Sequence, residues 1–306
     1  MTGRASPRTI AIAVVVALGL VAAIAAIVGR DGASEATEPL VRANPATGPF
    51  EGLGIWVDIY DAEAWEDPVT AVDTMVSNGV TTLYLQTSNS DRPGPFVFPD
   101  ETATFIDAAH DRGVQVIAWY LPHLTDLVVD RARTRAAISF TTPRGGRFDG
   151  FALDIESPAV RNPARRNERL MLLSQRLRTI AGDRYPLGAI VPSPVRLADD
   201  DAYWPGFPWG DLARAYDAVL PMTYYTFRVH GPADTIEYVT RAVDEIRAGV
   251  GSDAVPIHVI GGLARDATGP ETIAFARAVR DTDVLGASYY TLPFVSEEQW
   301  AILGRV

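Results

Sequence analysis

The sequence contains no cysteine, and this absence excludes several kinds of chemistry. Without thiols there is no disulfide, no thiolate metal site, no catalytic thiol and no lipid attached through cysteine. The compartment therefore cannot be deduced from redox chemistry. Lysine is also missing, so all 27 basic residues are arginines, set against 38 acidic residues. A formal net charge of −11 with scattered arginines argues against a nucleic-acid partner, which would need a basic face.

Several motifs of small-molecule chemistry are missing as well. No glycine-rich phosphate loop follows a predicted strand, and no serine lies in a nucleophile elbow. His110, His230 and His258 show no metal-ligand spacing relative to one another. We therefore expect neither a metal site nor a cofactor.

The first 30 residues carry a membrane-targeting pattern. Arg4 and Arg8 precede an uncharged apolar run at residues 9–29, and charge returns at Arg30. About 20 apolar residues suffice to cross a hydrocarbon core of about 30 Å, whereas the apolar part of a cleavable signal is shorter. The pattern predicts an uncleaved signal anchor at residues 1–30, a single-pass cell-membrane segment, with secretion after cleavage as the alternative. The two arginines favour an internal N-terminus, which places the remainder outside the cytoplasm.

Residues 31–50 and 51–306 differ in character. The first range is rich in Ala, Pro, Gly, Thr and Glu with little periodicity, which predicts a linker. The second has the length of one (β/α)8 barrel, and β-rich runs alternate with helical stretches along it eight times. We therefore predict an α/β protein, a single (β/α)8 TIM barrel preceded by an N-terminal transmembrane helix. The predicted strands are residues 54–60, 81–87, 114–121, 150–156, 185–191, 218–224, 256–262 and 285–291.

Functional groups of such barrels lie at the C-terminal ends of the strands. Side chains alternate between faces along a strand, so the aliphatic set should face the helices and the polar set the barrel interior. The alternation sends Asp154 and Glu156 of the fourth strand inward, with Glu156 at the mouth. The other residues that we expect at the site are Trp56, Asp58, Trp119, Met222, Tyr224 and Tyr290. Aromatic rings stack on sugars, and paired carboxyls raise one another's pKa, as glycosidases require of their acid.

The stretch FDGFALDIE resembles the fourth-strand signature of glycoside hydrolase family 18, the chitinase type, with the pattern D-G-x-D-x-D-x-E. Asp149, Gly150, Asp154 and Glu156 match it, and Ala152 replaces the middle aspartate. The resemblance implies that Glu156 is the general acid and that Asp154 orients the substrate N-acetyl group, which acts as the nucleophile.

A second motif extends the resemblance to the sixth strand. The family has Met-x-Tyr-Asp there, and the stretch PMTYY supplies Met222 and Tyr224, with Tyr225 in place of the aspartate. The resemblance implies that Tyr224 hydrogen-bonds the oxazolinium intermediate. No acid precedes Asp266 at the end of the seventh predicted strand, so a glutamate nucleophile at that position fits poorly.

Two functions of different classes follow. The first is an extracytoplasmic, membrane-anchored glycoside hydrolase that acts on a polysaccharide or cell-envelope glycan, amino-sugar polymers included, with Glu156 as its acid. The alternative is a non-catalytic carbohydrate-binding barrel of the cell envelope, which would explain the two missing acids. A weaker third interpretation is an envelope scaffold without a glycan ligand.

Overall fold

The computed structural model of the protein describes residues 39–89 and 92–304. The predicted transmembrane segment, residues 1–30, lies outside the described residues, as do the first eight residues of the predicted linker. Across the two described ranges, no helix combines the length and the apolar character that crossing a bilayer requires.

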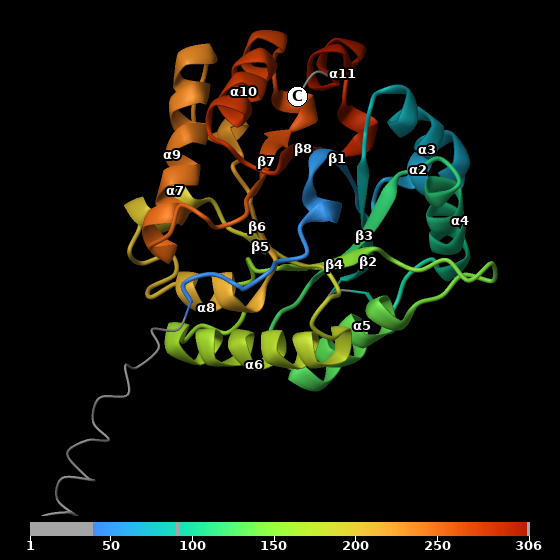
Figure 1. The fold of residues 1–306 in the computed structure, drawn as a ribbon, viewed down its shortest axis with the longest axis horizontal. Coiled ribbons are helices and arrows are strands. Elements are labelled where there is room, and N and C mark those ends of the chain that lie inside the picture. Colours follow the sequence, from blue (N-terminus) through green and yellow to red (C-terminus); the bar gives the residue numbers. More distant parts are fainter. Residues whose placement is uncertain (1–38, 90–91, 305–306) are drawn as a thin grey trace, which may run out of the picture. The chain divides into compact units, whose positions relative to one another are not determined.

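The core of the described chain is a ring of eight parallel strands, as predicted, with the helices around it (Figure 1). Seven neighbouring pairs are hydrogen-bonded ladders in the order β6-β5-β4-β3-β2-β1-β8-β7. Isolated bridges from Val219 to Ile257 and from Met222 to Ile260 link the segments of β6 and β7, so the barrel is nearly closed. The strands are β1 (Gly52–Val57), β2 (Thr82–Asn89), β3 (Gln115–Leu121), β4 (Gly150–Asp154), β5 (Leu187–Val191), β6 (Ala218–Pro221), β7 (His258–Leu263) and β8 (Gly286–Tyr290).

The helices begin where side chains cap their free amide groups. Asp126 accepts hydrogen bonds from the first turn of α5, Asn162 caps α6, and Thr268 and Glu271 form a capping box on α10. The described helices are α2 (Ala62–Glu66), α3 (Pro68–Ser77), α4 (Pro99–His110), α5 (Leu127–Ser139), α6 (Pro163–Ala181), α7 (Pro194–Asp199), α8 (Trp209–Ala215), α9 (Pro232–Val250), α10 (Gly269–Asp281) and α11 (Glu297–Leu303). Short 3-10 turns are η1 (Gly48–Phe50), η2 (Tyr225–Phe227), η3 (Ala264–Asp266) and η4 (Leu292–Phe294).

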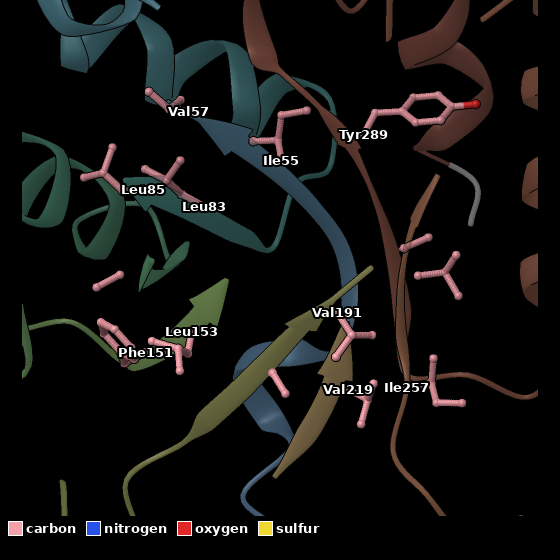
Figure 2. Close-up of a cluster of buried hydrophobic side chains, with 14 of the residues drawn as sticks. Ile55, Val57, Leu83, Leu85, Phe151, Leu153, Val191, Val219, Ile257 and Tyr289 are labelled. Atoms are coloured by element: carbon pink, nitrogen blue, oxygen red, sulfur yellow. The ribbon is translucent and has the colours of Figure 1, made fainter. Parts of the chain in front are cut away.

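Two separate apolar layers form the core, and strand alternation decides which residue enters which layer. Ile55, Val57, Phe151 and Leu153 pack between the strands and the helices (Figure 2). Trp56 and Ala152, which alternate with them, point into the barrel. The predicted assignment of faces on the first and fourth strands is therefore confirmed.

Residues 39–50, the described part of the predicted linker, bond to the N-terminal end of the barrel. Phe50 is fully buried in the barrel interior beside Gly188, where a Cβ atom would approach the Phe50 ring to 2.8 Å. Arg42 donates a hydrogen bond to the buried carboxylate of Asp217 at 2.9 Å, and Arg178 donates to its other oxygen at 2.7 Å. Composition cannot reveal such contacts, because Arg42 and Asp217 are distant in sequence.

His258 lies fully buried in the barrel interior and is held in its neutral form. Its Nδ1 atom lies 2.8 Å from the Phe50 carbonyl oxygen, and its Nε2 atom has no hydrogen-bond partner among the described residues. Nδ1 therefore carries the proton and donates a hydrogen bond to the carbonyl oxygen. Burial lowers the pKa of His258 from 6.5 to about 4, because a charged imidazolium would lose its hydration there.

This burial predicts an acid sensitivity that His258→Gln should remove. As the pH falls below 6.5, His258 binds a proton in the unfolded chain, whereas in the folded protein it stays neutral until about pH 4. The free energy of unfolding of the wild type therefore decreases over that window. We expect the loss, relative to the variant, to reach about 3 kcal/mol at pH 4. Denaturant unfolding of both proteins from pH 7 to 4 measures it. Parallel stability curves would show that His258 is not buried neutral.

Candidate active site at the carboxyl ends of the strands

A pocket opens at the C-terminal end of the barrel, where the sequence places the functional groups. Its volume is about 220 Å³, and residues from or just after six different strands line it. The lining residues are Tyr60, Gln86, Asn89, Trp119, Leu121, Asp154, Glu156, Met222, Tyr224 and Tyr290. Six of the eight predicted site residues are therefore brought together in one pocket, while Trp56 and Asp58 lie outside its lining.

Two carboxyl groups enter the pocket from the end of β4. Asp154 is the last residue of the strand and is 6% exposed, while Glu156 follows two residues later and is half-buried. Burial raises the pKa of both carboxyls, and the charge of Glu156 raises that of Asp154 further. The pair therefore keeps a proton at a pH at which exposed carboxyls have lost theirs.

Two buried polar atoms of this pocket have no partner within the described chain. One is Oδ1 of Asp154, and the other is Nε1 of Trp119 on β3. Buried polar groups are nearly always hydrogen-bonded, so two unsatisfied atoms in one pocket mark a position for a ligand or water. A hydroxyl group could satisfy either atom, because it can donate to a carboxyl oxygen or accept from an indole.

Asp58 forms a second carboxyl cluster behind the pocket wall. Its Oδ2 atom accepts a hydrogen bond of 2.6 Å from the Tyr290 hydroxyl, and its Oδ1 atom accepts one of 2.6 Å from the Tyr60 amide. Asp61 accepts from the Asp58 amide at 2.9 Å, and burial raises the pKa of Asp61 to about 6. Both oxygens of Asp58 are thus engaged, and it orients Tyr290, which does line the pocket.

Tyr224 lies between the two carboxyl clusters. Burial first, and then the charges of Asp154, Glu156 and Asp58, raises its pKa well above the usual value. Its hydroxyl is therefore a persistent hydrogen-bond donor. The ring of Tyr290 is 6.4 Å away between centroids, so two tyrosines lie together at the pocket, and the Tyr290 hydroxyl is already engaged with Asp58.

Trp56 is 2% exposed and fills the barrel interior. Its ring stacks on Tyr84 with centroids 4.3 Å apart, meets Trp119 edge-on at 5.6 Å, and donates from Nε1 to Ser288 at 2.8 Å. It thus supports Trp119 from inside the barrel. A direct contact of Trp56 with substrate stays a prediction.

Two aromatic rings near the pocket have exposed faces, and neither belongs to the eight predicted site residues. Tyr60, which lines the pocket, is 61% exposed, and Phe227 of η2 is 58% exposed with its ring 6.1 Å from that of Tyr224. Tyr60 follows the end of β1, and Phe227 follows the end of β6. A position shortly after a strand end is the sequence signal that could have identified them as site residues. Their exposure depends on loop conformation, which the pattern does not contain.

Neither of the two replaced family positions supplies an acid. Ala152 is fully buried in the barrel, and Tyr225 is turned into the helix-facing core, where its hydroxyl lies 2.5 Å from that of Tyr289. Among the described residues, no group of three or more His, Asp or Glu side chains is placed to hold a metal ion. Asp154 and Glu156 are the two carboxyl residues in the lining of the pocket.

Comparisons with known proteins confirm the predicted resemblance at the level of the fold. No protein-family model matches the chain, and no curated protein matches it by sequence. Among solved structures, a family 18 chitinase from Cycas revoluta in complex with (GlcNAc)3 is similar with a TM-score of 0.60 and 12% identity. The match covers 83% of this chain and 98% of the chitinase.

Two bacterial proteins share the same architecture. The spore cortex-lytic enzyme SleL of Bacillus cereus is 11% identical with a TM-score of 0.62, over 83% of this chain and 73% of that one. The PgaB glycoside hydrolase domain of Bordetella bronchiseptica is 13% identical with a TM-score of 0.57, over 83% and 98%. Chitinases and related glycoside hydrolase barrels are thus the structural neighbours of this divergent chain.

The hydrogen bond from Tyr290 to Asp58 should contribute measurably to stability. In Tyr290→Phe, Oδ2 of Asp58 would lose its donor in a buried position, so we expect a loss of about 1–3 kcal/mol in the free energy of unfolding. Tyr84→Phe is the matched control, because the Tyr84 hydroxyl is buried without a partner and its removal should be neutral or stabilising. Denaturant titrations of the wild type and both variants measure the change in the free energy of unfolding. Equal losses in both variants would contradict this assignment of the hydrogen bond.

Proposed function

We propose that this protein is a glycoside hydrolase whose barrel lies outside the cytoplasm, anchored in the cell membrane by residues 9–29. The substrate is a polysaccharide or cell-envelope glycan, amino-sugar polymers included. The carboxyl pair Asp154 and Glu156, with raised pKa values in a pocket that also holds an unsatisfied indole donor, carries the proposal. The neighbours' titles, among them a chitinase with (GlcNAc)3 and a cortex-lytic enzyme, support a glycan substrate.

In the proposed reaction Glu156 donates its proton to the glycosidic oxygen as the bond to the anomeric carbon breaks. A general acid needs a pKa near the working pH, and burial moves Glu156 in that direction. With an N-acetylated substrate, the acetamide oxygen would attack the anomeric carbon. Asp154 and the protonated Tyr224 hydroxyl are the groups that would hold the acetamide.

The size of the pocket suggests how a polymer would lie. Its 220 Å³ is below the roughly 300–1,000 Å³ of typical ligand pockets, so we infer that it encloses one sugar ring. Neighbouring sugars would then cross the rim, where the exposed rings of Tyr60 and Phe227 offer stacking surfaces.

A non-catalytic carbohydrate-binding barrel is the second candidate. The observation in its favour is the loss of two family acids, because Ala152 and Tyr225 leave the Asp154 and Glu156 pair without further acidic support. The two candidates differ in turnover and share the expectation of glycan binding.

Glu156→Gln should abolish hydrolysis without abolishing binding. Glutamine keeps the shape of the side chain but has no proton to donate at the pH of the reaction, so we expect turnover of chito-oligosaccharides or peptidoglycan fragments to fall by about 10²- to 10⁴-fold. Glu168→Gln, the same change at an exposed position on α6, is the control and should leave the rate unchanged. Release of reducing ends measures turnover, and calorimetry measures binding.

The outcomes of that experiment separate the candidates. Equal turnover by the wild type and Glu156→Gln would remove Glu156 as the acid. Binding by both proteins without turnover by either would establish the carbohydrate-binding alternative. No binding of any envelope glycan would leave the scaffold interpretation.

Asp154→Asn should move the alkaline limb of the pH–rate profile to lower pH. Two neighbouring carboxyls resist losing both protons, so removing one lets the other ionise earlier. Because activity needs protonated Glu156, the rate should decline at a lower pH than in the wild type. Asp266→Asn, an exposed change after β7, is the matched control. An unshifted or raised alkaline limb in Asp154→Asn would contradict the coupling of the pair.

A further inference from the structure

The positive charge of this acidic protein is concentrated on one pair of helices. The adjacent helices α5 and α6 carry eight arginines and two acidic residues, a net charge of +6, so the rest of the chain carries −17. Figure 1 shows them side by side along one side of the barrel. Arg133 and Arg166 are buried and Arg178 pairs with Asp217, so the other five arginines carry the positive charge of this surface.

The outward arginines of this surface are not neutralised by ion pairs. Arg131 and Arg135 of α5 and Arg165 and Arg176 of α6 are exposed, and none forms an ion pair with an acidic side chain of residues 39–89 or 92–304. Glu168 is the exposed acid of α6, and Asp126 is occupied in capping α5. We call this surface, with Val128 and Leu172, the basic face.

Apolar side chains lie between these arginines. Val128 is 69% exposed and Leu172 is 44% exposed. They line a cleft of about 210 Å³ between the two helices, whose remaining lining residues are Leu127, Arg131, Leu173 and Arg176. A polar polyanion would not fill such an apolar cleft. The boundary between lipid headgroups and acyl chains matches both the apolar side chains of the cleft and the arginines at its edge.

A second cleft of the same surface is lined by arginines. Arg161, Arg165 and Arg169 border a volume of about 280 Å³ near the N-terminal end of α6. Guanidinium groups bind phosphate through two parallel hydrogen bonds, which makes arginine suited to phosphodiester headgroups. Arg169 also donates hydrogen bonds to the Leu124 and Thr125 carbonyls, so Arg161 and Arg165 are the arginines of this cleft left to face a ligand. A cleft lined by arginines and an apolar cleft therefore lie on one surface.

The described chain begins beside the same helices. Arg42 donates a hydrogen bond of 2.6 Å to the carbonyl of Asp183, two residues after the end of α6. In the sequence only nine residues, 30–38, separate Pro39 from the proposed membrane segment, and nine residues span at most about 30 Å. This step rests on the proposed anchor, which would keep the barrel near the membrane surface.

We propose that the basic face docks on a bilayer surface that contains anionic phospholipid. The arginines bind headgroup phosphates, and Val128 and Leu172 enter the boundary with the acyl chains. This interaction turns one side of the barrel toward the membrane, so the pocket at the strand ends opens along the membrane and not directly away from it. The docking is independent of whether the pocket hydrolyses glycans.

The absence of native cysteine allows a direct test on the full chain. Leu172→Cys places a single fluorophore on the basic face, and Ile273→Cys, 56% exposed on α10 on the far side of the barrel, is the matched control. Both proteins are inserted into nanodiscs of phosphatidylcholine, with or without phosphatidylglycerol, that carry spin-labelled lipid as quencher. We expect quenching at position 172 only, and only with phosphatidylglycerol.

Charge reversal then tests the arginines. Each arginine near an anionic surface contributes roughly a fivefold change in affinity, so Arg131→Glu with Arg176→Glu should weaken quenching at position 172 by more than about 25-fold in affinity. Circular dichroism checks that these exposed changes leave the fold intact. Added salt should weaken the quenching of the unreversed protein.

Three results would overturn the proposal. One is equal quenching at positions 172 and 273, and another is quenching that does not depend on phosphatidylglycerol. The third is that soluble polyphosphate binds as tightly as the anionic discs do, while the label at position 172 stays in water with either ligand. That result would assign the basic face to an anionic polymer. Failure of the full chain to enter nanodiscs would refute only the anchor, and sedimentation with phosphatidylglycerol vesicles would then test docking by itself.

Discussion

A parallel barrel closes only if every second side chain of each strand points inward, and this alternation governs the rest of the protein. It sends Ile55 and Val57 to the helices and Trp56 to the interior. On β4 the same rule forces Asp154 into a buried position at the strand end. The fold thus holds a carboxyl where water cannot solvate it, and the raised pKa follows from that placement.

Polar groups inside the barrel are unequally satisfied. Toward the N-terminal end, Asp217 accepts hydrogen bonds from two arginines and two backbone amides. His258 bonds to the Phe50 carbonyl through Nδ1, and its Nε2 atom has no partner among the described residues. At the C-terminal end, Asp154 and Trp119 each leave an atom unsatisfied within the described chain. An unsatisfied buried group lowers stability, so its presence in a pocket favours a role in binding.

Much of the fold was predictable from local pattern. All eight predicted strands overlap the observed ones, because β-branched and aromatic runs between glycine and proline turns are typical of barrel strands. The strand ends were less exact: the first predicted strand extends to residue 60, whereas β1 ends at Val57, where Asp58 and Asp61 form their own hydrogen-bonded turn. The inward direction of Trp56 was predicted, but its stacking on Tyr84 and its contact with Trp119 depend on neighbours from other strands. The exposure of Tyr60 was not predicted, because it depends on the conformation of the turn after β1.

The sequence by itself determined the strand periodicity, the two carboxyls at the end of β4 and the excess of arginine in α5 and α6, since each is a property of neighbouring residues. Only the tertiary structure decided that Tyr290 of β8 binds Asp58 after β1, that Tyr225 turns away from the pocket, and that the arginines of two helices form one face. These features join residues that are far apart in the chain, and the burial and distance that give them their chemistry exist only once the barrel has closed.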